Sequence, residues 1–182
     1  TLDRAQAGTL LEVDHARVTL INLALSGGDT TVHCRRGASC LLRNVSVTGG
    51  DGTAINVSEG AHLELADSEV AANARPALLI SNNASSRFLG EVTVGGEHRP
   101  GLQLTGLSSL DASGARLTNS NGIEVDSAWL HLEAASIRGG LTLEGNAQAT
   151  LREGVSVDQV YCGPDSGLTS SPVDCPGVIA HP

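Results

Sequence analysis

Two sets of acidic and imidazole side chains are the candidates for catalysis in this chain of 182 residues. Glu12 and His33 occupy the same position in two successive repeat units, where a carboxylate and an imidazole can exchange a proton. Asp67, Glu69 and Glu91 form the second set, because aligning the repeats places Asp67 against Glu91. Such carboxylates suit glycosidic-bond cleavage or Ca²⁺ binding, and Ca²⁺ is the one cofactor the sequence suggests.

Plainer interpretations exist for both sets. Glu12 and His33 fit a solvated cross-strand pair, and Asp67 and Glu91 fit a continuation of polar turn residues that begins at Asn22 and Asn44.

Trp129 and His131 are the candidates for ligand binding. Trp129 falls at an outward position just before a predicted strand, where an exposed indole can stack on a sugar ring or anchor a partner. A lone Trp also commonly covers the edge of an apolar core, so that alternative stays open. The six His are scattered and show no zinc-ligand spacing.

An internal repeat must position these residues. Seven segments recur with a period of about 18 to 24 residues, each holding a short alternating apolar run, a turn and a second alternating run. Alternation with period two predicts β-strands, and we expect the first runs to stack so that one residue per segment forms an apolar column. The expected column is Leu11, Val32, Ile55, Leu79, Leu102, Ile123 and Leu141.

The repeat predicts an all-β fold, a right-handed parallel β-helix of about seven coils over residues 8–157. Residues 1–7 are expected to be the remnant of a preceding coil or a lead-in. Residues 158–182 are expected to form a capping segment. A β-sandwich is the alternative, although it does not require seven equivalent registers.

The four cysteines form two local pairs along the chain, Cys34 with Cys40 and Cys162 with Cys175. Three connectivities are possible, and the local one is the most economical. We expect two disulfides, the second stapling the C-terminal cap, which would place the protein outside the reducing cytosol. Buried free thiols are the alternative.

Composition limits the partners. A net charge of −9 argues against nucleic acid, and no apolar run approaches the length of about 20 residues needed to span a membrane. Only 2 % of residues are aromatic, so the core must be aliphatic. Every basic residue other than His is Arg, a bias that suggests a bacterial source.

The repeated stretches ARVTLINLALSGG (residues 16–28) and ASCLLRNVSVTGG (residues 38–50) resemble the right-handed β-helix, or pectate-lyase-like, superfamily. The resemblance covers residues 8–157 and rests on Asn22 and Asn44 at equivalent turns, since Asn stacks are a feature of that fold. It implies either a polysaccharide lyase, hydrolase or epimerase, or a non-catalytic surface protein.

The sequence favours the non-catalytic reading: an extracytoplasmic module, secreted, periplasmic or on a bacterial surface, with a structural, adhesive or ligand-presenting role. Its expected partners are a polysaccharide or another surface protein, with end-to-end or lateral self-association as a further possibility. A polysaccharide-active enzyme is the alternative.

Overall fold

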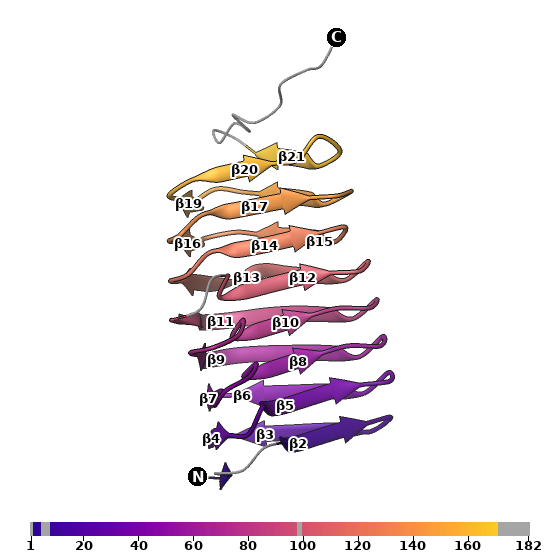
Figure 1. The fold of residues 1–182 in the computed structure, drawn as a ribbon. Coiled ribbons are helices and arrows are strands. Elements are labelled where there is room, and N and C mark those ends of the chain that lie inside the picture. Colours follow the sequence, from indigo (N-terminus) through magenta and orange to yellow (C-terminus); the bar gives the residue numbers. More distant parts are fainter. Residues whose placement is uncertain (1, 5–7, 98–99, 171–182) are drawn as a thin grey trace.

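The computed structural model describes residues 2–4, 8–97 and 100–170 (Figure 1). Every regular element in these residues is a β-strand, which confirms the predicted all-β class. Eight strands form one sheet, here called the first-strand sheet, in an order that follows the chain. They are β2 (Thr9–Asp14), β5 (Thr30–Arg35), β8 (Ile55–Val57), β10 (Leu78–Ile80), β12 (Leu102–Thr105), β14 (Ile123–Asp126), β17 (Leu141–Glu144) and β20 (Val160–Cys162).

The remaining 13 strands form the second sheet. The N-terminal half of this sheet contains β1 (Leu2–Arg4), β3 (Arg17–Ile21), β4 (Ala24–Gly27), β6 (Ser39–Arg43), β7 (Ser46–Thr48) and β9 (His62–Ala72). The other half contains β11 (Ser85–Gly96), β13 (Ser109–Asn119), β15 (Trp129–Leu132), β16 (Ser136–Ile137), β18 (Gln148–Leu151), β19 (Ser156–Val157) and β21 (Gly167–Ser170).

Every strand pairs in parallel with the equivalent strand of the next coil. The chain therefore climbs as a parallel β-solenoid of about seven turns, and Figure 1 shows the coils stacked from the N-terminus to the C-terminus. This confirms the predicted β-helical architecture. A β-sandwich is excluded, because its strands pair antiparallel.

An aliphatic core fills the space between the two sheets. Columns of Val, Leu and Ile from the first-strand sheet are buried, and Phe88 is the one aromatic side chain in the buried core of the described residues. Just after the first turn of most coils a buried Ala faces the core; these residues are Ala38, Ala61, Ala84, Ala128 and Ala147.

The inward column differs from the expected one in the fourth coil. Leu78 pairs with Ile55 and with Leu102, and Ile80 pairs with Val57 and with Leu104. Leu78 and Ile80 are fully buried, whereas Leu79 is partly exposed. The predicted inward position of Leu79 and outward position of Ile80 were therefore wrong by one residue.

A disulfide crosses the core of the second coil. Cys34 on β5 and Cys40 on β6 are bonded, with Cα atoms 6.6 Å apart, and both are buried. The bond ties the two sheets together and confirms the first predicted pair. Cys162 is also disulfide-bonded, while its predicted partner Cys175 lies outside the described residues.

The parallel pairing extends beyond the predicted coils at both ends. β1 pairs with β4, in the place of the third strand of an earlier coil. β20 pairs with β17 and β21 with β18, so both sheets continue past Val157, where the coils were expected to stop. The rest of the predicted cap, from residue 171, lies outside the described residues.

Candidate functional site

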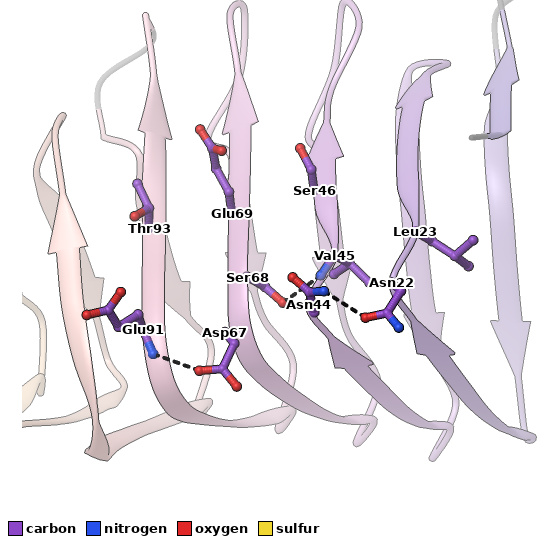
Figure 2. A pocket seen from close by; sticks show the side chains of 10 residues that line it. All are labelled: Asn22, Leu23, Asn44, Val45, Ser46, Asp67, Ser68, Glu69, Glu91 and Thr93. Atoms are coloured by element: carbon purple, nitrogen blue, oxygen red, sulfur yellow. Dashed lines mark hydrogen bonds between the residues drawn. The ribbon is translucent and has the colours of Figure 1, made fainter.

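A shallow groove of about 570 Å³ runs across the first four coils, beside the bend between the second and third strands (Figure 2). We call it the acidic groove. Amide, hydroxyl and carboxylate side chains make up most of its wall: Asn22, Asn44, Ser46, Asp67, Ser68, Glu69, Glu91 and Thr93, with Leu23 and Val45 completing it.

The bend is built by residues with left-handed backbone conformation. Asn22, Asn44 and Asp67 have φ of 58°, 50° and 48°, which Asn and Asp tolerate better than most side chains. Asn44 Nδ2 donates to Asn22 Oδ1 at 2.7 Å, so the two amides stack along the rod. The Asn residues that mark the resemblance to β-helices therefore line this groove (Figure 2).

The residue stacked on Asp67 is Gly90, not Glu91 as the alignment of repeats predicted. Gly90 has the left-handed φ of 65° that the bend requires, and the register of β11 against β9 shifts between Leu89 and Val92. Glu91 instead donates its backbone N–H to Asp67 Oδ1 at 3.2 Å. Its side chain aligns with Arg116 of the next coil.

The three carboxylates of the groove are exposed and spread over two coils. Glu69 lies between Ser46 and Thr93 in the ladder, and Asp67 has Arg43 at 4.0 Å as its nearest cation. Within the described part of the chain, no three His, Cys, Asp or Glu side chains come close enough together to hold a metal ion.

Glu12 and His33 are register partners on β2 and β5, but each side chain has another partner. The Glu12 carboxylate pairs with Arg35 at 2.5 Å, and His33 Nε2 lies 3.1 Å from Ser58 Oγ. Burial lowers the pKa of His33, and the nearby charge of Arg35 lowers it further. An imidazole that hydrogen-bonds to a hydroxyl of the next coil has a structural role in the stack.

Charges alternate along this edge of the rod. Arg35 also contacts Asp14 at 3.3 Å, while Arg36 bridges Asp14 at 2.8 Å and Glu59 at 3.3 Å. Each pair joins neighbouring coils, so the network links three coils, and its two Arg offset most of the charge of its three carboxylates.

A second groove, of about 300 Å³, lies on β13, β15 and β18; we call it the Trp129 groove. Trp129 is 48 % exposed and stands in register between Ser109 and Gln148. Two residues further along each strand, Asp111, His131 and Thr150 form a parallel row on the same face.

Asp111 and His131 interact across neighbouring strands in this groove. His131 Nδ1 lies 3.8 Å from Asp111 Oδ1, and the backbone N–H of Ser113 donates to the same oxygen at 3.0 Å. That hydrogen bond, with the Ser113 side chain, holds the pKa of Asp111 below its usual range. Asp111 is thus an ionised acceptor beside the exposed indole.

Sequence reasoning selected Trp129 and His131 but missed Asp111, Gln148 and Thr150. The signal was available, because aligning Leu110 with Leu130 already pairs Asp111 with His131. None of these three residues is unusual when each repeat is read alone.

Comparisons with known proteins give no family for the chain: no family model matches it, and neither a curated protein nor a solved structure does. Among the described residues, no helix is long and apolar enough to cross a membrane.

Proposed function

We propose that this chain is a non-catalytic, extracytoplasmic β-solenoid module that presents fixed side chains to a polysaccharide or to another surface protein. The observation that carries the proposal is the unbroken parallel register of the first-strand sheet from β2 to β20. Because each coil is locked to its neighbours, outward side chains stand on a lattice of about 4.8 Å by about 7 Å, which suits recognition of an extended ligand.

The extracytoplasmic location is supported by the Cys34–Cys40 disulfide, because such bonds persist in oxidising compartments. The location and the pectate-lyase-like relationship remain parts of this proposal. Both parts of the proposal are supported by the parallel β-solenoid fold, which this chain has in common with secreted β-helix proteins.

The partnering of the candidate catalytic groups also favours a presenting role. Arg35 holds Glu12, and Ser58 holds His33, so neither group is poised toward an open substrate site. The acidic groove carries three carboxylates with one Arg in contact at 4.0 Å, so it would repel the anionic uronans that lyases and epimerases of this superfamily act on.

A polysaccharide-active enzyme is the second candidate, and one observation favours it. Asp67 and Glu91 lie on adjacent coils, about 4.8 Å apart at the backbone, which allows the carboxyl separation of about 5 to 10 Å found in glycosidases. Hydrolysis of a neutral glycan is the reaction that this pair would suit.

One experiment separates the two candidates. The protein is tested on a glycan array and in reducing-end and unsaturated-product assays with pectate, alginate, xylan and glucan. We expect binding to at least one glycan and no product with any. Product formation that disappears in Asp67→Asn or Glu91→Gln, but persists in the matched groove variant Thr93→Val, would establish the enzyme and overturn the presenting role.

A further inference from the structure

We propose that the Trp129 groove is a binding site for a neutral pyranose unit of a glycan, with the indole as stacking platform and Asp111, His131 and Gln148 as hydrogen-bonding groups. The inference rests on the proposed function and deepens it, because it names the surface that binds and the class of ligand that is bound.

The indole is carried by a well-anchored strand and is available. The backbone N–H of Trp129 donates to Ser108 O at 2.9 Å, and the flanking residues Ala128 and Leu130 are buried in the core. The side chain therefore projects from a rigid strand while 48 % of it is exposed. A large, preordered apolar surface loses little conformational entropy when a flat ligand covers it.

The polar groups surround the indole in the pattern that a sugar needs. Ser109 and Gln148 flank Trp129 along the rod, and Asp111 and His131 lie about 7 Å further along the strands. A pyranose has an apolar face of C–H groups and a rim of hydroxyls. Stacking the face on the indole directs the rim toward carboxylate, imidazole and amide groups that can accept or donate hydrogen bonds.

His131 has hydrogen-bonding capacity that the protein does not use. Its Nδ1 faces Asp111, but its Nε2 is enclosed and lacks a hydrogen-bond partner among the described residues. Leaving such an atom unpaired is costly, and because Nε2 is enclosed His131 offers the ligand the exposed part of its ring, of which 31 % is accessible.

The local charge selects a neutral ligand. Along the rod the outward ladder reads Glu64, Arg87, Asp111 and His131, so acidic groups alternate with a basic group and an imidazole. The charge of Arg87 acts on Asp111 and helps to balance it. Two carboxylates set against one Arg leave the ladder at most one negative charge, which is a weak attraction for an amino sugar, and the net charge of −9 opposes a uronate.

A glycan fits better than a protein partner. Protein interfaces centre aromatic anchors in a continuous apolar patch. The other exposed large hydrophobic residues of the described chain are Ile21, Leu107 and Tyr161, and none of them lines the Trp129 groove. An isolated aromatic ringed by polar groups is the arrangement expected for a sugar.

The single Trp makes the test direct, because indole emission reports this groove alone. The protein is titrated with cello-, xylo-, manno- and malto-oligosaccharides, and with oligogalacturonate and chitosan oligomers. We expect a saturable change in Trp emission with at least one neutral oligosaccharide and weaker or no change with the charged ones. By calorimetry, Trp129→Ala should weaken binding about tenfold or more, and Asp111→Ala about threefold to tenfold.

Tyr161→Ala is the matched control, since Tyr161 is a comparably exposed aromatic on the other sheet, and its affinity should equal that of the parent. Trp129→Phe, which keeps a ring, should retain part of the binding, and far-UV circular dichroism checks the fold of each variant. Glycan binding that survives Trp129→Ala would overturn this inference and leave the presenting function standing. No binding to any glycan, or emission changes caused only by an added protein, would overturn both the site and the choice of ligand.

Discussion

In this rod the interaction partners of a side chain lie mainly on the coils before and after its own. The next coil supplies the partner in three cases: Arg35 for Glu12, Arg36 for Asp14 and Ser58 for His33. The ionisation of a group therefore depends on the stack. His33 shows this best, because burial between Glu12 and Asn56 in the ladder and the charge of Arg35 both lower its pKa.

The lowered pKa of His33 predicts a loss of stability in mild acid. The unfolded chain, with a His pKa of about 6.5, binds the proton more tightly than the folded chain does. This component of stability is complete above about pH 6.5 and is lost as the pH falls below that value. Tm measured from about pH 8 to pH 5 should fall less steeply in His33→Gln than in the parent.

His15→Gln is the control, because His15 is an exposed turn residue and its replacement leaves His33 in place. If His33→Gln and the parent lost Tm in parallel, the imidazole would not be the group that titrates.

Stacking on the strands of the two neighbouring coils decides which side chains of a strand point into the core and which point outward. In β10 the run Leu78, Leu79, Ile80 is apolar throughout, and stacking on Ile55 and Val57 buries the first and third of these residues. In β11 the shift between Leu89 and Val92 moves Glu91 out of line with Asp67. The disulfide adds a covalent tie between the sheets at the level of the second coil.

The register of β10 predicts unequal effects of two neighbouring substitutions. Ile80→Ala leaves a cavity in the core and should lower the free energy of unfolding by about 2 to 5 kcal/mol. Leu79→Ala removes a partly exposed side chain and should cost less than about 1.5 kcal/mol. Urea unfolding of both variants measures the difference, and equal losses would contradict the register.

The Cys34–Cys40 bond predicts a measurable contribution to stability. It closes a loop between residues six apart in sequence, for which the loss of unfolded-state entropy stabilises the fold by about 2 kcal/mol. Replacing both cysteines by Ala should lower the free energy of unfolding by at least that amount, since a small cavity is added. Denaturant unfolding of the double variant against the oxidised parent provides the measurement, and an unchanged midpoint would show that the bond adds nothing.

The whole molecule is an acidic rod in which three of the eleven Arg residues, Arg35, Arg36 and Arg43, form ion pairs within the described residues. The net charge is −9, and the ion pairs of Arg35 and Arg36 join neighbouring coils on one edge. Two grooves open on the outer face of the second sheet, the acidic groove over the first four coils and the Trp129 groove over the fifth to seventh coils. The same backbone architecture therefore carries a carboxylate-lined groove on the N-terminal coils and a groove around an indole on the later coils.

The net charge predicts how binding responds to salt. Raising ionic strength from about 0.01 M to about 0.15 M shortens the Debye length from about 30 Å to about 8 Å. Affinity for a neutral oligosaccharide should stay constant over that range. Residual binding of oligogalacturonate should strengthen, because screening weakens repulsion from the acidic rod. Calorimetric titration at both salt concentrations tests this, and uronate binding that weakened with salt would show a basic site instead.

The sequence by itself determined the fold class, the number of coils and the composition of the core. Alternating apolar residues in seven equivalent segments leave few other ways to bury their apolar faces, and Asn22 and Asn44 mark the bends that need a left-handed backbone. The Cys34–Cys40 bond also followed from spacing, since the two residues flank one short turn.

Only the tertiary structure decided the phase of β10 and the shift in β11, and it alone showed that the residues aligned around Trp129 line a groove. A run such as Leu78–Ile80 has no alternation, so its orientation is set by the energy of stacking on the neighbouring coils. The groove that joins Asp111, Trp129 and Gln148 gathers residues about 20 positions apart in the chain, and the inter-coil hydrogen bonds that bring them together are properties of the stack.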